Sequence, residues 1–173
     1  MLHNEKWLPI INESGTVYGK IAYSQSLQMK NKYLHPIIRI ALIHNGKIFL
    51  REKENTKEND KPCLDYPFER YIFYKETVDK AVIKTLQANG SKPDVNCNYL
   101  FHYIHRSKEI QRIVYLYICN IRNNSLLEKI NQNGGKWWTS KQIKDNLNTG
   151  LFSVFFENEF EFLESTVLAF DKQ

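Results

Sequence analysis

Residues 75–83 have the sequence KETVDKAVI, and this stretch opens the helix that decides the fold. Thr77 is suited to cap the helix N-terminus and Gly90 to end it, so a helix is predicted over Thr77–Asn89. Its apolar residues recur at helical spacing and form a single face: Val78, Ala81, Val82 and Leu86. This face is expected to pack against the rest of the chain.

The segment before this helix is predicted to form two paired strands. Ile37–Ile43 is a nearly continuous apolar run rich in β-branched residues, which is typical of a strand covered on both faces. Asn45-Gly46 is the strongest short signal for a hairpin turn, and Lys47–Arg51 is the expected return strand.

Further elements are predicted on both sides of this hairpin from apolar patterns and turn signals. The predicted strands are Trp7–Ile11 and Thr16–Ala22, which form an N-terminal hairpin, then Asn98–His105, Ile110–Ile121 and Lys136–Trp138. The predicted helices are Ser140–Leu147, with Thr139 as its cap, and Phe155–Ala169, with Phe155, Phe162 and Leu163 in the core. This order of elements indicates an α/β fold whose central sheet is mixed in direction.

The composition is that of a globular chain, with 42% apolar and 25% charged residues among 173. No apolar stretch approaches the roughly 18–20 residues that span a bilayer, and the N-terminus has no signal-peptide pattern. A cytoplasmic protein without membrane contact is therefore expected. The cysteines lack metal-ligand spacing, and Cys63, Cys97 and Cys119 are expected to be buried, reduced thiols.

The net charge of +5 is unevenly distributed along the chain. Residues 1–150 hold 23 Lys and Arg against 14 Asp and Glu, whereas residues 151–173 hold one Lys and five acids. Because 18 of the 24 cations are lysines scattered singly, they are expected to form an ordinary solvated surface. Nucleic acid is therefore not an expected partner.

These residues resemble a Nudix domain, the fold of the Nudix hydrolase superfamily. The family motif is G-x5-E-x7-R-E-U-x-E-E-x-G-U, where U is a bulky aliphatic residue, and its helix carries carboxylates that hold Mg²⁺ or Mn²⁺ against a diphosphate. KETVDKAVI resembles the start of the motif helix, residues 34–51 resemble the opening hairpin, and KWWT at 136–139 resembles the step after the last strand. Residues 10–22 resemble the leader of the isopentenyl-diphosphate-isomerase-like branch.

The resemblance covers residues 7–165 and implies an α/β/α sandwich with a central mixed β-sheet. It implies a single Nudix-like domain over residues 1–173, with an N-terminal hairpin at 7–22 and a core at 35–165.

The second half of the Nudix motif is missing. With Glu76 as the first motif glutamate, the motif arginine falls on Lys84 and the next glutamate on Thr85, while the two metal-binding glutamates fall on Ala88 and Asn89. Positions 85, 88 and 89 share one helix face, which here presents a hydroxyl, a methyl and a carboxamide. A Mg²⁺ site normally needs carboxylate ligands. We therefore expect a Nudix fold that has lost pyrophosphohydrolase activity and has no metal cofactor.

Two routes to retained chemistry stay open as alternatives. Glu76 with Glu69, Asp65 or Glu109 would rebuild a metal site, which would make the chain a divergent, Mg²⁺-dependent hydrolase of a nucleoside diphosphate linked to another moiety. Metal binding by histidines is the second route, but these side chains are expected to be ordinary surface or rim groups: His35, His44, His102 and His105. Isomerase chemistry is not expected, because Glu69 and Tyr71 occupy the positions of that branch's cysteine and histidine.

Ligand binding is the function that the remaining residues support. The candidates for contact with a phosphate-containing small molecule are Arg39, Arg51, Glu69 and Arg70. Arg70 replaces the first motif glycine, so its guanidinium either binds a phosphate or fills the vacated metal space and pairs with Glu76.

The loop around Arg70 is rich in aromatic residues, and it either packs as a strand or stacks a base: Tyr66, Phe68, Tyr71, Phe73 and Tyr74. A homodimer and an interaction module that uses a sheet edge or the acidic last helix are the other expectations.

Overall fold

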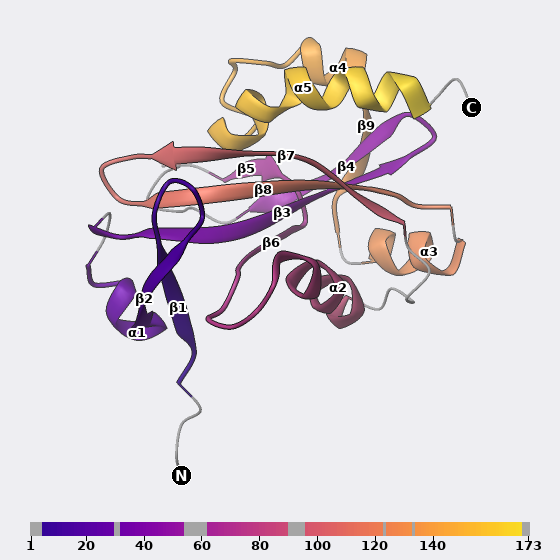
Figure 1. Cartoon of the computed structure of the whole chain (residues 1–173). Coiled ribbons are helices and arrows are strands. Elements are labelled where there is room, and N and C mark those ends of the chain that lie inside the picture. Colours follow the sequence, from indigo (N-terminus) through magenta and orange to yellow (C-terminus); the bar gives the residue numbers. More distant parts are fainter. Residues whose placement is uncertain are drawn as a thin grey trace. The chain divides into compact units, whose positions relative to one another are not determined.

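The computed structural model describes residues 5–29, 32–53, 62–89, 96–122, 124–132 and 134–170 (Figure 1). Its strands are β1 Trp7–Ile11, β2 Val17–Ala22, β3 Leu34–His44, β4 Lys47–Lys53, β5 Cys63–Asp65, β6 Phe68–Tyr71, β7 Cys97–Arg106, β8 Gln111–Asn120 and β9 Lys136–Thr139. Its helices are α1 Tyr23–Ser26, α2 Val78–Ala88, α3 Asn124–Gln132, α4 Ser140–Lys144 and α5 Val154–Phe170.

The main sheet has the strand order β5-β4-β3-β8-β7, with β6 paired to β3 and β9 paired to β4, and β1 and β2 form a separate two-stranded sheet. The predicted α/β class with a central mixed sheet is confirmed. Two compact units make up the chain. The first unit spans Met1–Arg39, Phe68–Asn89 and Tyr99–Tyr117, and the second spans Ile40–Pro67, Gly90–Asn98 and Ile118–Gln173.

The first unit contains the predicted N-terminal hairpin. In the antiparallel pair of β1 and β2, Leu8 lies opposite Ile21 and Ile10 lies opposite Gly19. Buried Leu8, Ile10 and Ile21 form an apolar cluster, and four partly buried aromatic rings pack against it: Tyr23, Tyr33, Tyr71 and Phe73. The hairpin is thereby anchored to the segment that precedes α2.

Helix α2 begins as predicted. The backbone N–H of Lys80 donates to Thr77 Oγ1 at 3.3 Å, so Thr77 caps the helix. The buried face consists of Ala81, Val82, Thr85 and Leu86. Tyr117 OH donates to Asp79 Oδ1 at 3.2 Å and joins the first turn of α2 to β8. Burial and the Asp79 carboxylate together raise the pKa of Tyr117 to about 12.

The second unit contains the predicted turn and cap signals. Asn45 and Gly46 both have positive φ, 47° and 65°, as a two-residue hairpin turn requires, and the turn joins β3 to β4. Thr139 forms a capping box with Gln142 at the start of α4. A Cβ on Gly135 would lie 2.6 Å from the Leu50 carbonyl oxygen, so only glycine fits beside β4 at this point.

The predicted core of the last helix is wrong at one position. Phe155 and Leu163 are buried in α5, but Phe162 is 61% exposed. The buried face also includes Phe156 and Phe160, so α5 has apolar residues on more than one side and periodicity alone does not select the inner face.

The expectation of three reduced thiols is wrong for two of the cysteines. Cys97 and Cys119 are joined as a disulfide, and their Cα atoms are 4.3 Å apart. The two residues lie 22 positions apart on neighbouring strands, so strand pairing brings them together and sequence spacing does not reveal it. Cys63 is a buried thiol. None of the helices in the described part of the chain is long and apolar enough to cross a membrane.

Candidate functional site

A cavity of about 330 Å³ opens in the first unit. Its lining comes from the residue before β1, α1, β3, β6, the loop after β6 and β8: Lys6, Tyr23, Ile37, Glu69, Arg70, Tyr71, Phe73 and Arg112. Three cationic side chains face one carboxylate, and three aromatic rings complete the wall. An anionic ligand with a flat or apolar part suits this combination of charge and rings.

The carboxylate of Glu69 lies between two arginines. Arg39 Nη1 donates to Glu69 Oε2, and the Arg39 side chain is fully buried. Arg112 Nη1 lies 3.5 Å from Glu69 Oε1. Arg39 therefore supplies the buried counter-charge of Glu69, and much of the Arg112 charge remains available to the cavity.

Arg112 also packs on the aromatic wall of the cavity. Its guanidinium carbon lies 5.3 Å from the centroid of the Tyr71 ring, and Nη2 donates to Tyr71 OH at 3.3 Å. Among the described residues, Arg112 Nε is buried without a hydrogen-bond partner. A buried donor without a partner is costly, and a ligand acceptor would relieve this cost.

Glu76 is the motif glutamate that remains, and two cations surround it. Arg70 Nη2 lies 2.7 Å and Lys84 Nζ 3.2 Å from Glu76 Oε1, while the backbone N–H of Phe73 donates to Oε2. Arg70 Nε also donates to Thr85 Oγ1 at 2.9 Å. Of the two predicted roles of Arg70, pairing with Glu76 is the one found in the structure.

The residues at the motif positions do not fit a Mg²⁺ ion. Thr85 Oγ1 donates to the Ala81 carbonyl, and the Asn89 side-chain amide donates to the Thr85 carbonyl at 2.7 Å. Both polar groups therefore satisfy the helix backbone, and the cations beside Glu76 would repel a metal ion. Within the described residues, no group of three His, Cys, Asp or Glu side chains is arranged to hold a metal ion.

The backbone before Glu76 retains the shape of a glycine position. Lys75 has φ 68°, in the left-handed region that costs an L-residue about 1–2 kcal/mol. In the start of the motif helix that KETVDKAVI resembles, a glycine precedes the glutamate. The loop thus keeps its conformation although lysine has replaced the residue best suited to it.

The other predicted ligand residues lie apart from this cavity lining or in the second unit. Arg51 belongs to the second unit and lies opposite Asp65 in the β4–β5 pair. The Asp65 carboxylate pairs with Lys53 Nζ at 3.1 Å and accepts a hydrogen bond from the backbone N–H of Tyr66. The backbone N–H of Glu109 donates to Ser107 Oγ in the turn between β7 and β8.

Two of the histidines, His35 and His44, form hydrogen bonds with backbone carbonyl groups. His35 is buried, contrary to its predicted place on the surface or rim, because it lies in the buried strand β3, where its Nδ1 donates to the Pro9 carbonyl at 2.8 Å. His44 Nδ1 bonds the Ile121 carbonyl at 2.7 Å. On β7, exposed His102 is hydrogen-bonded through Nδ1 to Tyr99 OH at 2.5 Å, and His105 is half-buried.

His35 should make the free energy of unfolding depend on pH. Burial, with a further contribution from Arg112, lowers the pKa of His35 below 6.5, so the unfolded chain binds a proton more readily than the folded protein. Stability is therefore expected to fall as the pH drops below about 6.5, by up to about 1.4 kcal/mol per pH unit. Urea unfolding between pH 7.5 and 5 measures this slope. The slope should become shallower in His35→Gln.

Sequence reasoning did not select Lys6, Tyr23, Ile37 or Arg112 for the site. Arg112 had a usable signal, since it is the one charged residue in the predicted strand at residues 110–121. Lys6 and Tyr23 had none, because they flank the hairpin and reach the cavity only through tertiary packing.

Comparisons with known proteins identify the fold. No family model and no curated protein matches the sequence. The protein DR0079 from Deinococcus radiodurans matches with a TM-score of 0.65 and 14% identity over 95% of this chain and 98% of that one. A NUDIX hydrolase from Nitrosomonas europaea matches with a TM-score of 0.55 and 9% identity over 76% and 89% of the two chains.

The MutT protein from Methanosarcina mazei matches with a TM-score of 0.53 and 14% identity, over 77% of this chain and 95% of that one. The predicted Nudix fold is therefore confirmed.

Proposed function

We propose that this Nudix-fold protein has lost metal-dependent pyrophosphohydrolase activity and binds a phosphate-containing small molecule in the cavity of the first unit. The observation that carries the proposal is the ion-pair cluster at Glu76. Arg70 and Lys84 neutralise the carboxylate that a Nudix metal site would need. The same arginine lines the cavity, so a protein side chain supplies the positive charge that a metal ion would bring.

The charge of the cavity supports binding of an anion. Lys6, Arg70 and Arg112 outnumber Glu69, which Arg39 already neutralises from the buried side. Guanidinium groups bind phosphate oxygens through paired hydrogen bonds, and they do so without a divalent cation. Binding to this cavity should therefore be insensitive to metal chelation.

Four finer assignments belong to the same proposal. The missing motif acids make the box degenerate, and the hairpin of β1 and β2 at the expected place supports the isopentenyl-diphosphate-isomerase-like branch. A cytoplasmic location and a homodimer remain predictions from the sequence.

Isothermal titration with inorganic pyrophosphate and with ADP tests the proposal. We expect both compounds to bind in EDTA without a divalent cation, and no release of product from either compound when Mg²⁺ is present. Arg112→Gln should weaken binding about tenfold or more, because a charged hydrogen bond to a ligand contributes about 1.5–3 kcal/mol. Arg106→Gln, which removes an exposed arginine of β7 outside the cavity lining, is the matched control.

Turnover that is abolished by EDTA would contradict the proposal and support the divergent hydrolase instead. In that case Glu69→Gln and Glu76→Gln should each remove the activity, since both carboxylates would belong to the relocated metal site. If neither pyrophosphate nor ADP binds at millimolar concentration, the ligand-binding function itself is contradicted.

A further inference from the structure

The excess positive charge of this protein belongs to one unit. The segments of the first unit contain 12 Lys and Arg against six Asp and Glu, a net charge of +6. The segments of the second unit contain 12 against 13, a net charge of −1. A field of one sign on the unit that holds the cavity favours a polyanionic partner.

Within the first unit, lysines and aromatic rings form one surface, which we call the basic–aromatic surface: Lys6, Trp7, Lys20, Tyr74 and Lys75. Lys20 Nζ lies 4.6 Å from the Trp7 ring centroid and 5.3 Å from that of Tyr74. Lys75 Nζ lies 6.0 Å from the Tyr74 centroid. Trp7 is 39% exposed, so its ring is accessible to a ligand.

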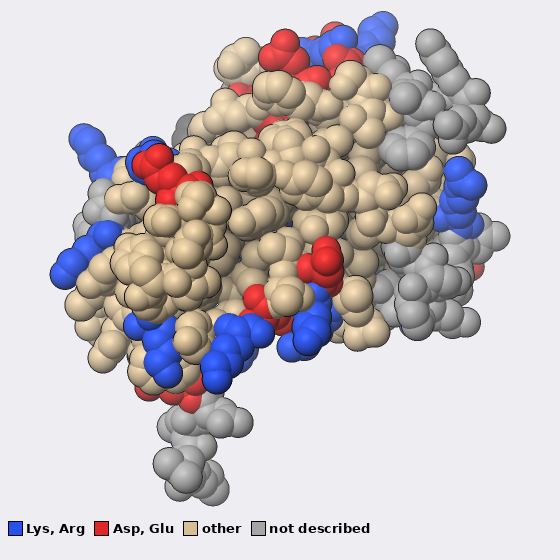
Figure 2. All heavy atoms as spheres, in the orientation of Figure 1, with Lys and Arg blue, Asp and Glu red and all other residues tan. Residues whose placement is uncertain are grey.

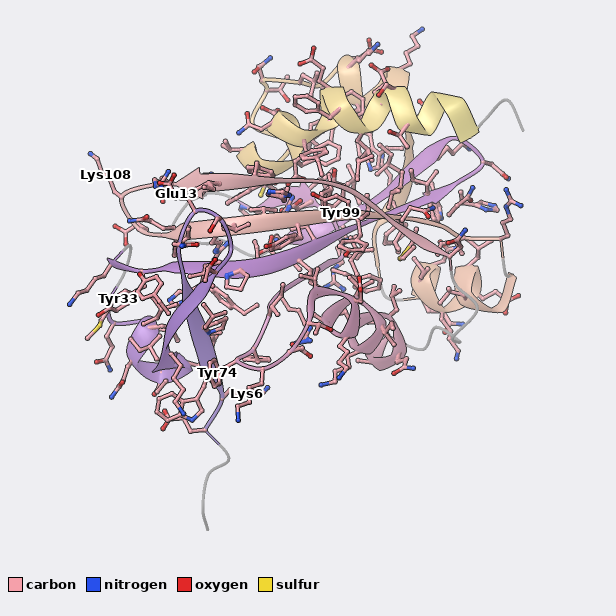
Figure 3. All side chains as sticks on the ribbon, in the orientation of Figure 1. Lys6, Glu13, Tyr33, Tyr74, Tyr99 and Lys108 are labelled. Atoms are coloured by element: carbon pink, nitrogen blue, oxygen red, sulfur yellow. A yellow bond between two sulfur atoms is a disulfide. The ribbon has the colours of Figure 1, made fainter. Side chains whose placement is uncertain are left out.

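Three segments distant in sequence build this surface. The backbone N–H of Tyr74 donates to the Trp7 carbonyl at 2.8 Å, which joins the loop before α2 to β1. Lys20 comes from β2, whose residues pair with β1. Figure 3 places Lys6 and Tyr74 beside each other at the base of the hairpin, and Figure 2 shows blue side chains gathered in the same region. The neighbouring Glu5 carboxylate accepts a hydrogen bond from Ser24 Oγ at 2.6 Å.

The basic–aromatic surface continues into the cavity. Lys6 belongs to both, since it lines the cavity and its Nζ lies 5.1 Å from the ring centroid of Phe73, another cavity residue. Arg70 lies 5.5 Å from the centroid of the same ring inside the cavity. Alternating cations and rings thus extend from the exposed surface to the phosphate-binding arginines.

We propose that the basic–aromatic surface binds single-stranded nucleic acid whose terminal phosphate enters the cavity. The inference rests on the proposed function, because the cavity must bind phosphate. Exposed aromatic rings stack unpaired bases, and lysines beside them contact the backbone phosphates. Double-stranded nucleic acid does not offer unstacked bases, and an acidic peptide does not present a ring beside every negative charge as a nucleotide chain does.

This inference changes the expectation from the sequence that nucleic acid is not a partner. The lysines are scattered in sequence, as that expectation stated, but hairpin formation and the Tyr74–Trp7 hydrogen bond bring three of them together. Such a cluster is invisible to a search for runs of Lys and Arg.

Fluorescence anisotropy with a labelled ten-nucleotide single strand, with and without a terminal phosphate, tests the inference. Trp7→Ala and Tyr74→Ala should each weaken binding about 5- to 100-fold, as expected for loss of one stacked base. Lys20→Gln should reduce the slope of log affinity against log salt by about 0.7. Tyr18→Ala, at a 66% exposed ring on the same hairpin, and Lys108→Gln, in the turn after β7, should leave affinity unchanged.

Pyrophosphate titration of the same variants separates this inference from the proposed function. Trp7→Ala and Tyr74→Ala should bind pyrophosphate as the native protein does, which also shows that they are folded, whereas Arg112→Gln should weaken the binding of both ligands. Pyrophosphate binding without oligonucleotide binding would overturn the inference and leave the proposed function intact. An equal loss of oligonucleotide affinity in Tyr18→Ala would overturn the inference. Equal affinity for strands with and without the terminal phosphate would overturn the part of it that places this phosphate in the cavity.

Discussion

Replacing Arg39 with methionine is expected to destabilise the protein by about 3–5 kcal/mol. The Arg39 side chain is fully buried in β3 and pairs with Glu69, whose side chain is only 19% exposed. Methionine matches the length of the aliphatic part but leaves the Glu69 carboxylate largely desolvated, with Arg112 at 3.5 Å as a more distant counter-charge. The loss of a buried partner costs far more than the pair itself contributes. Urea unfolding measures the change.

Arg106→Met is the matched control for this substitution. Arg106 pairs with Glu13 near the tip of the hairpin, but the two side chains are 49% and 72% exposed. Water and salt screen such a pair, so its loss should cost less than about 1 kcal/mol. Similar losses for Arg39→Met and Arg106→Met would contradict the view that burial makes the Arg39–Glu69 pair important.

Restoring the missing acids is expected to create metal binding that the native protein lacks. The variant combines Arg70→Gly, Thr85→Glu, Ala88→Glu and Asn89→Glu. Two of the new carboxylates would lie on α2 and the third at its C-cap, and removal of Arg70 takes away one of the two cations beside Glu76 and opens the space beside Thr85. Carboxylates in this number are typical ligands of Mg²⁺ and Mn²⁺. Mn²⁺ should raise the free energy of unfolding by about 1–3 kcal/mol at 10 to 100 times the Kd, and the melting temperature should rise with it.

The same four-residue variant with Gln in place of each new Glu is the control, because it has similar size and no added charge. Mn²⁺ should not change the thermal unfolding of this control or of the native protein. Stabilisation of the native protein by Mn²⁺ would contradict the assignment of a lost metal site. If the Glu variant folds but Mn²⁺ does not stabilise it, the missing acids are not what prevents metal binding.

Local signals predicted much of the fold. The run Ile37–Ile43, the Asn45-Gly46 turn and the Thr77 and Thr139 caps were all identified correctly, because each depends on residues within a few positions of one another. Helix α3 was missed although Leu126 and Ile130 have helical spacing and are buried. Its segment is polar and short, so its two apolar residues did not stand out.

The candidate site was predicted less completely. Glu69 and Arg70 were candidates from the sequence and both line the cavity, and the pairing of Arg70 with Glu76 was one of two alternatives. Arg112, Lys6 and the Cys97–Cys119 disulfide were not anticipated. Each of these depends on which strands lie side by side, and spacing along the chain does not contain that information.

By itself, the sequence determined the α/β class, the capped motif helix and the absence of acids at positions 85, 88 and 89, since these follow from residue type and local periodicity. Only the tertiary structure decided that Arg70 and Lys84 surround Glu76 and that Arg39 is buried against Glu69. It also decided that Lys6, Lys20 and Tyr74 share one surface. The physical reason is that electrostatic and stacking interactions depend on distance in space, and folding sets that distance between segments far apart in the chain.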